Sequence, residues 1–173
     1  TDVGDPNYWL WRITWHDKKA YGVGYECGKE RVTRLYSSAD GKAFTRLVDP
    51  LFTEGYPNEH ALVFQPDGTC LCLLRRDGKP STGQLGHAKA PYKEWKWRDL
   101  GVRIGGPNMI QLPDGKLIAV VRLYTPRVRT SVCSVDAKTG TITELLALPS
   151  GGDTSYAGMI WHDDLLHISY YSS

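Results

Sequence analysis

The pattern of apolar and polar positions predicts short β-strands joined by tight turns. Residues 61–64 and 69–74 are apolar runs rich in strand-forming residues. Between them, residues 66–68 (Pro-Asp-Gly) have the residue types that favour a tight turn. The two runs therefore predict one antiparallel β-hairpin. In contrast, the continuous apolar run at residues 117–121 indicates a strand that is buried on both faces.

The hairpin recurs along the chain. Aligning the copies on the aspartate of the turn gives Asp17, Asp67, Asp114 and Asp163, which are separated by 50, 47 and 49 residues. A period of nearly fifty residues with four short strands in each period is typical of a β-propeller, in which each repeat forms one blade. The alternative is an ordinary β-sandwich in which similar hairpins occur by chance.

The repeat predicts three four-stranded blades and a half-blade of an all-β fold. Because propellers need at least about four blades to close a ring, we expect either a fragment of a larger propeller or a homodimer that forms through open blade edges. The blades are expected at about residues 7–52, 55–101 and 105–149 and the half-blade at 153–173, all within one partial propeller domain of residues 1–173.

The first blade is expected to open with one alternating strand at residues 8–15. Alternation places successive side chains on opposite faces of a strand. One face would then carry Trp9, Trp11, Ile13 and Trp15, and the other Leu10, Arg12 and Thr14.

Composition excludes some classes of partner. The formal net charge is +2 over 173 residues and no block of like charge occurs, so neither nucleic acid nor an anionic membrane is an implied partner. No apolar run approaches the length of about 20 residues that a membrane-spanning helix needs, and the first residues do not have a signal-peptide pattern. The 6 tryptophans and 10 tyrosines suit both propeller cores and carbohydrate-facing surfaces.

The candidate chemistry is expected at one end of the propeller axis. Residues just before the first strand and just after the second strand of each blade converge there. A group of arginines favours a ligand with a carboxylate, because a guanidinium binds a carboxylate through two parallel hydrogen bonds. A glutamate beside a tyrosine accepts a phenolic proton that otherwise dissociates only near about pH 10. The expected group comprises Glu59, Arg75, Arg76, Asn108, Arg122, Arg129 and Tyr156.

On these residues the sequence resembles the exo-α-sialidase (neuraminidase) family, whose members are six-bladed propellers with Asp-box (BNR) repeats. Residues 37–44 resemble a degenerate Asp-box turn, and Glu59 precedes Arg75 by sixteen residues, close to the spacing of that family. The resemblance spans essentially the whole chain. Its specific parts are residues 9–15 with 20–24, 56–76, 105–108 with 112–115, and 148–156 with 169–173.

The resemblance implies a retaining glycoside hydrolase that removes terminal sialic acid, with Tyr156 as nucleophile and Glu59 as its base. It also implies a sialylated glycan or related acidic sugar as partner, no metal or organic cofactor, and a secreted or periplasmic location. The substrate carboxylate would be bound by Arg75 or Arg76 together with Arg122 or Arg129, and Asn108 would also bind substrate.

The sequence also departs from that family. The first carboxylate-binding arginine and the general-acid aspartate of the sialidase family have no counterpart in this chain. We therefore expect the chain alone to be inactive.

Three alternatives stay open. A non-catalytic glycan-binding propeller would not need Glu59 within about 5 Å of the Tyr156 hydroxyl. A purely structural propeller would pair its arginines with local carboxylates such as Asp77 or Asp153. A different glycosidase would use two carboxylates, for which Glu59 and Asp153 are the candidates.

Overall fold

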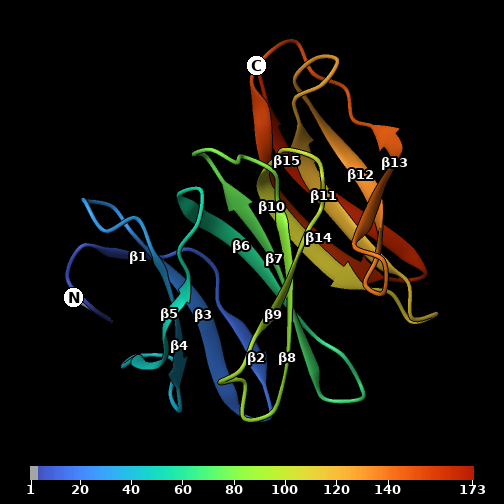
Figure 1. Cartoon of the computed structure of the whole chain (residues 1–173). Coiled ribbons are helices and arrows are strands. Elements are labelled where there is room, and N and C mark those ends of the chain that lie inside the picture. The colour runs from blue at the N-terminus through green and yellow to red at the C-terminus, as the bar shows by residue number, and fades with distance from the viewer. Residues whose placement is uncertain (1–3) are drawn as a thin grey trace.

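The computed structural model describes residues 4–173, in which fifteen β-strands form four antiparallel sheets and no helix occurs. The predicted domain begins at residue 1, so its first three positions lie outside the described residues. The sheets follow one another around a common centre in chain order, from blue to red (Figure 1). This is the predicted all-β architecture of propeller blades.

Each blade is built mainly from neighbouring hairpins. The first blade comprises β1 (Tyr8–Leu10), β2 (Thr14–His16), β3 (Lys19–Glu26), β4 (Thr33–Ser38) and β5 (Thr45–Phe52). In it β3 lies next to both β1 and β2, and β4 and β5 follow outward. The second blade comprises β6 (Pro57–Phe64), β7 (Thr69–Arg76), β8 (Gln84–Lys89) and β9 (Lys96–Asp99), and the third comprises β10 (Ile104–Gln111), β11 (Leu117–Leu123), β12 (Arg129–Asp136) and β13 (Thr141–Ala147). In these two blades the strands pair in chain order.

A two-stranded sheet of β14 (Thr154–His162) and β15 (Leu165–Ser172) forms the half-blade. Among the described strands β15 pairs only with β14, so its outer edge is open. Within residues 4–173 the structure has no helix that is long and apolar enough to cross a membrane.

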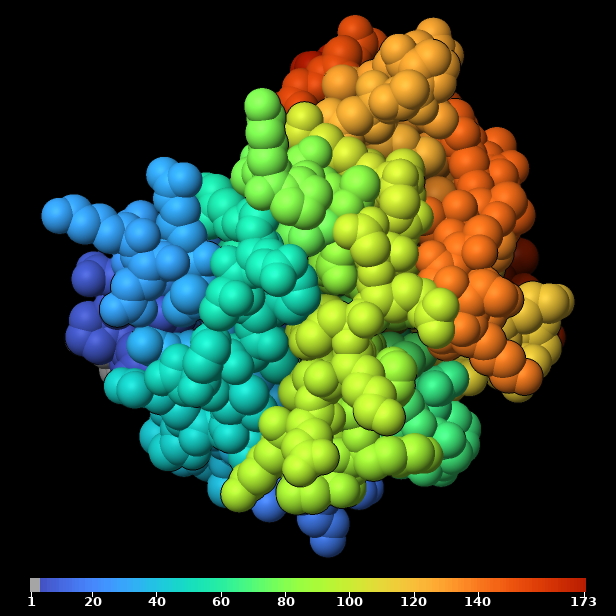
Figure 2. All heavy atoms as spheres, viewed as in Figure 1, coloured from blue at the N-terminus to red at the C-terminus, as the bar shows by residue number. Residues whose placement is uncertain are grey.

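The apolar run on β11 is buried on both faces, as its sequence indicates. Leu117, Ala119 and Val121 pack in a cluster with residues of the second blade. Ile118 and Val120 pack in another cluster with the half-blade. Adjacent blades thus share cores, and they occupy contiguous sectors of the molecule (Figure 2).

The single strand expected at residues 8–15 is wrong, because the structure interrupts it. β1 ends at Leu10, β2 begins at Thr14, and both pair with β3. Alternation in the sequence continues through the break and therefore conceals it. The interruption places Trp11 against Tyr156 and directs the Arg12 guanidinium to the Ala157 carbonyl oxygen, at the centre of the propeller.

The first two blades are joined by a buried histidine. The fully buried His60 accepts a hydrogen bond at Nε2 from the Val23 backbone N–H, at 3.2 Å. Burial, assisted by the Arg12 charge, lowers the pKa of His60 to about 3. The imidazole is therefore neutral at physiological pH, as its acceptor role requires.

Candidate functional site

A buried glutamate connects three sheets at the propeller axis. The Tyr156 hydroxyl donates to Glu59 Oε1 at 2.9 Å, while Arg75 Nη1 and the Gly106 backbone N–H donate to Oε2 at 2.7 and 2.9 Å. The Glu59 side chain is 7 % exposed, and both of its oxygens accept hydrogen bonds. A carboxylate that accepts three donors in this way is held in a fixed orientation.

These residues reach the axis because the innermost strands are bulged. The strand pairing is irregular between Gly105 and Asn108 in β10 and between Ser155 and Gly158 in β14. A bulge turns a side chain or backbone group away from its regular direction. In each of these two bulges the second residue, Gly106 or Tyr156, has a positive φ of 53°.

Tyr156 is strained and partly open to solvent. A bulky residue rarely adopts the left-handed conformation, and such strain persists only where the surrounding structure enforces it. Its ring lies 5.1 Å from that of Trp11 and 5.7 Å from that of Tyr171. Burial and the Glu59 carboxylate raise the pKa of Tyr156. The phenol therefore keeps its proton at neutral pH and donates a hydrogen bond to Glu59.

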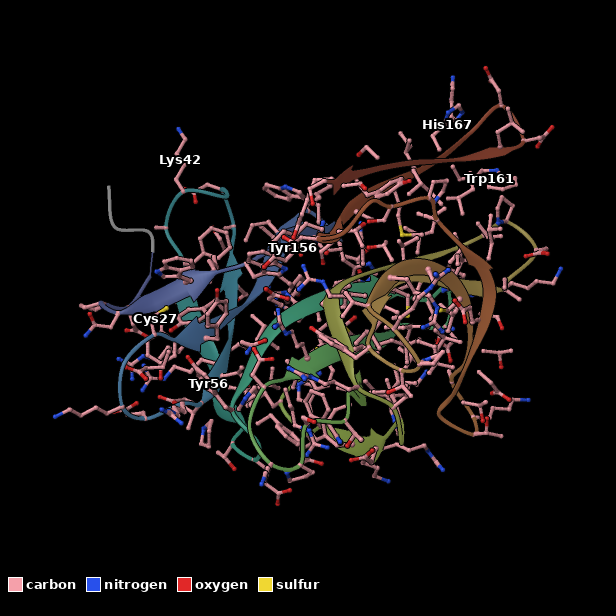
Figure 3. The ribbon with its side chains drawn as sticks, turned by 90° about the horizontal axis from the view of Figure 1, so that it is seen from above. Cys27, Lys42, Tyr56, Tyr156, Trp161 and His167 are labelled. Atoms are coloured by element: carbon pink, nitrogen blue, oxygen red, sulfur yellow. The ribbon has the colours of Figure 1, made fainter. Side chains whose placement is uncertain are left out.

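Gly106 is required by the closeness of the half-blade. A Cβ at this position would overlap Ser155 Oγ and lie 3.0 Å from Tyr156 Cδ1. Its N–H also points at Glu59, so the glycine fits both the conformation and the space. Figure 3 shows Tyr156 near the middle of the molecule, next to the first blade, whereas Trp161 and His167 lie far out on the terminal hairpin.

Arg75 joins the site to a second carboxylate. It also donates to Asp77 Oδ1, at 2.9 Å from Nη2. Asp77 in turn accepts from Asn58 Nδ2 at 2.8 Å and lies 3.5 Å from Arg103 Nη2. The guanidinium of Arg75 is thus held between two carboxylates, and it fixes Glu59 in place.

Asn108 contacts the backbone next to Tyr156. Its Nδ2 donates to the Ala157 carbonyl oxygen at 2.9 Å, and Arg12 Nη2 donates to the same oxygen at 3.0 Å. The carbonyl that follows Tyr156 is therefore held from the first and the third blade.

Arg122 belongs to a neighbouring cluster. Its Nη2 donates to Asp153 Oδ1 at 3.1 Å and to the Tyr171 hydroxyl at 2.7 Å, and this hydroxyl donates to Asp153 Oδ2 at 2.8 Å. The ring of Tyr171 contacts that of Tyr156. Arg122 therefore lies near Tyr156, with its charge already paired.

The remaining two predicted arginines are placed elsewhere. Arg76 is buried inside the second blade, where it pairs with Asp99 and donates to the Thr82 carbonyl oxygen at 2.6 Å. Arg129 binds Glu144 through two hydrogen bonds of 2.7 and 2.6 Å on the third blade. The structure does not bring these two side chains together with Glu59.

Sequence reasoning missed Trp11 and Arg12. The alternating pattern assigned them to opposite faces of a regular strand, whereas both contact the Tyr156 segment. A usable signal was Gly22 on the partner strand, where a Cβ would lie 2.8 Å from the Arg12 carbonyl oxygen. Among residues 4–173 no cluster of three or more His, Cys, Asp or Glu side chains forms a metal site.

Comparison with solved structures gives the fold. The chain is similar to a protein of unknown function from Dyadobacter fermentans (TM-score 0.80, 18% identity, covering 93% of this chain and 48% of that one). It is also similar to an exo-β-1,3-galactanase from Phanerochaete chrysosporium bound to β-1,3-galactotriose (TM-score 0.72, 12% identity, 93% and 42%). A Bacillus subtilis arabinanase is a third similar structure (TM-score 0.70, 15% identity, 93% and 65%). The fold is a β-propeller.

The chain spans about half the length of the first of these structures, and less than two thirds of each of the others. No protein-family model matches the sequence, and no curated protein matches it.

The resemblance to exo-α-sialidases is wrong. The similar structures include a galactanase and an arabinanase, whose propellers differ in type from the six-bladed sialidase propeller. The Asp-box assignment lacks support for the same reason. The turn itself is built from local bonds, since Asp40 accepts from the N–H groups of Lys42 and Ala43 at 2.9 and 3.1 Å. Asp-Gly turns of this chemistry occur in many β-proteins and do not identify a family.

Proposed function

We propose that this chain is part of a propeller glycoside hydrolase in which Tyr156 is the nucleophile and Glu59 its base. The observation that carries the proposal is the 2.9 Å hydrogen bond from the hydroxyl of a strained tyrosine to a buried carboxylate. Proton transfer needs a base within hydrogen-bond reach of the proton it removes, and this pair meets that condition. The likeness of the fold to a galactanase and an arabinanase supports a sugar as substrate.

The reaction is a double displacement. Tyr156 Oη forms a bond to the anomeric carbon, its proton passes to Glu59 Oε1, and the bond from the anomeric carbon to the leaving oxygen breaks. Water then attacks the anomeric carbon, the bond to Tyr156 breaks, and Glu59 returns the proton to the phenolic oxygen. The leaving group departs as an oxyanion, and it is neutralised by the proton that the attacking water loses. Two inversions give retention of configuration.

The surrounding groups prepare this pair. Arg75 and the Gly106 N–H hold the Glu59 carboxylate so that Oε1 faces the phenol. Trp11 and the held Ala157 carbonyl fix the tyrosine ring and its backbone. Rigid support of this kind lowers the cost of reaching the reactive geometry.

A second candidate is a purely structural propeller. The observation that favours it is that the predicted carboxylate-binding arginines are paired within the protein, Arg76 with Asp99, Arg122 with Asp153 and Arg129 with Glu144. Such a protein would neither bind nor cleave a sugar at this site.

Hydrolysis of 2,4-dinitrophenyl glycosides tests the proposal, because dinitrophenolate leaves without protonation by a general acid. The panel comprises galactosides, galacturonosides, arabinosides and xylosides. Tyr156→Phe is expected to reduce turnover by about 10³-fold or more, and Glu59→Gln by about 10²-fold or more. Tyr170→Phe is the matched control, since it also removes one hydroxyl from the terminal hairpin, where it donates to the Pro149 carbonyl oxygen. Neither turnover nor sugar binding in the unsubstituted chain would instead support the structural candidate.

A further inference from the structure

The charges around the Tyr156–Glu59 pair do not balance. Two carboxylates, Glu59 and Asp77, are shared by Arg75 and Arg103. Arg12 supplies a third guanidinium to this region, and it interacts electrostatically with the Glu59 carboxylate. Within residues 4–173 no carboxylate lies in ion-pair distance of Arg12. The site therefore carries one positive charge without a counter-charge.

Arg12 is also incompletely hydrogen-bonded. Its Nη2 donates to the Ala157 carbonyl oxygen at 3.0 Å, but its Nε is buried and has no partner among the described residues. Burial lowers the pKa of Arg12, and the Glu59 charge opposes that effect. A partly buried guanidinium with no counter-charge and an unused donor is costly, and proteins seldom retain one without a ligand or partner.

A second unpartnered donor lies in the same segment. Trp11 Nε1 is buried without a hydrogen-bond partner, and the Trp11 ring packs at 5.1 Å from that of Tyr156. Ser155 Oγ, next to Tyr156, is buried and unpartnered as well. Buried donors of this kind normally bind an acceptor. Trp11 and Ser155 thus place unpartnered groups beside the reactive tyrosine, and such groups favour a ligand with acceptor oxygens.

We propose that Arg12 binds a carboxylate on the sugar ligand, so that the substrate class is a uronic acid-containing glycan. The inference rests on the proposed function and adds the chemistry of its substrate. One unbalanced positive charge matches a carboxylate, which carries one negative charge at pH 7, better than a phosphate with nearly two. A tyrosine nucleophile fits this substrate, because a neutral phenol does not repel an anionic sugar as a second carboxylate would.

Arg12 is a better carboxylate ligand than the arginines singled out by the sequence. Arg75, Arg76, Arg122 and Arg129 each bind a carboxylate of the protein already. The Ala157 carbonyl is also held by Asn108, so the contact of Arg12 with it is not the sole anchor of the Tyr156 segment.

Titration of the full chain with methyl galacturonoside and methyl galactoside tests the inference, because these sugars differ only at C6. Calorimetry is expected to show binding of the acid about 10- to 100-fold tighter than that of the neutral sugar, the range of a charge-assisted hydrogen bond. The ¹⁵N resonance of Arg12 Nε can be assigned by its loss in Arg12→Lys. It is expected to shift when methyl galacturonoside is added and to stay unchanged when methyl galactoside is added. This readout does not depend on turnover.

Substitutions separate binding from positioning. Arg12→Gln is expected to lower affinity for the acid to that for the neutral sugar and to leave the neutral sugar within about twofold, while Arg12→Lys recovers part of the preference. Arg127→Gln removes the same charge from an exposed arginine and should change neither affinity. Equal affinities in the unsubstituted chain, or equal loss for both sugars in Arg12→Gln, would overturn the inference while the proposed function stands. Binding of neither sugar would overturn the inference, and the dinitrophenyl glycosides would then decide on the proposed function separately.

Discussion

Tyr156 and Gly106 share a left-handed backbone conformation, and they meet beside the Glu59 carboxylate. Holding a tyrosine in this conformation costs on the order of 1–3 kcal/mol. The cost is borne because two donors fix the following carbonyl, and because Glu59 binds the hydroxyl. Tyr56 and Tyr92 also have a positive φ, so Tyr156 is set apart as a candidate nucleophile by the hydrogen bond from its hydroxyl to Glu59 and by its support from three blades.

Replacing Gly106 with alanine tests the fit at this position. The new methyl group would overlap Ser155 Oγ and press on the Tyr156 ring. We expect Gly106→Ala to lower the free energy of unfolding by about 1–3 kcal/mol more than Gly68→Ala. Gly68 is the matched control, since its φ is also positive, at 78°, but nothing lies within 4 Å of its Cβ position. Urea unfolding measures both, and equal losses would show that Gly106 is needed only for its conformation.

How far single residues were predictable depends on what brings them together. Glu59 and Arg75 were correctly expected side by side, because the hairpin pairs His60 with Leu74, and the irregularity between Pro57 and His60 still leaves Glu59 in contact with Arg75. The same register explains why their spacing of sixteen residues suggested the wrong family: any hairpin with this turn produces it. Arg76, one residue further, lies on the other face of β7, where it pairs with Asp99 and does not contact Glu59.

At the scale of elements, the third blade shows why Arg129 was misleading as a site candidate. It lies at the start of β12 and reaches across to Glu144 on β13, which also accepts from the Ser131 hydroxyl at 2.7 Å. The hydrogen bonds from Arg129 and Ser131 lower the pKa of Glu144 to about 2. This arginine therefore joins two strands of its own blade. Its sequence position gave no sign of the partner, because Glu144 comes fifteen residues later, on the next strand.

Glu144 is expected to make stability dependent on acid. Its pKa is lower in the folded protein than in the unfolded chain, so its contribution is complete above about pH 4.5 and disappears as the pH falls toward 2. We expect Glu144→Gln to lower the free energy of unfolding by about 1 kcal/mol at pH 7, since the pair is partly exposed, and by almost nothing near pH 2. Urea unfolding across this range is the measurement. A constant difference at every pH would contradict the account, and Glu54→Gln, at an exposed turn, is the control.

His60 should produce a second, distinct pH dependence. The folded protein keeps His60 neutral down to about pH 3, whereas the unfolded chain binds a proton below its ordinary pKa of 6.5. The unfolded state then binds more protons, so stability falls as the pH decreases from 6.5, by about 1.4 kcal/mol per pH unit from this group. His60→Gln retains an acceptor for the Val23 N–H and is expected to remove that slope. An unchanged slope between pH 6 and 4 would refute the role of His60.

The residues of the candidate site come from sheets that are far apart in sequence, so only the arrangement of the whole molecule brings them together. Arg12 and Ala157, 145 positions apart, meet because the successive blades curve around one axis. The repeat in the sequence predicted this curvature and hence the meeting of Glu59 with Tyr156. It did not predict the break between β1 and β2 that delivers Arg12, because a local loss of pairing leaves no mark in an alternating pattern.

The open edge of the half-blade should be visible in hydrogen exchange. β11 pairs on both sides and is buried on both faces, whereas β15 pairs only with β14 among the described strands. Amides of β15 that do not bond to β14 are expected to exchange orders of magnitude faster than those of β11 in the free chain. Exchange of β15 as slow as that of β11 would show that its edge is covered, as it would be in a homodimer joined through this strand. Measurement at two protein concentrations separates these cases.

In the proposed reaction Tyr156 attacks an anomeric carbon while Glu59 takes the phenolic proton. The direct measurement is covalent trapping by 2-deoxy-2-fluoroglycosyl fluorides, including the galacturonosyl form, followed by mass spectrometry of peptides. Fluoride leaves without an acid, the anomeric carbon bonds to Tyr156 Oη, and the second step is slowed by the fluorine at C2. We expect one adduct per chain, located on Tyr156 and absent in Tyr156→Phe. An adduct on Glu59 or Asp153, or none with a sugar that binds, would contradict it.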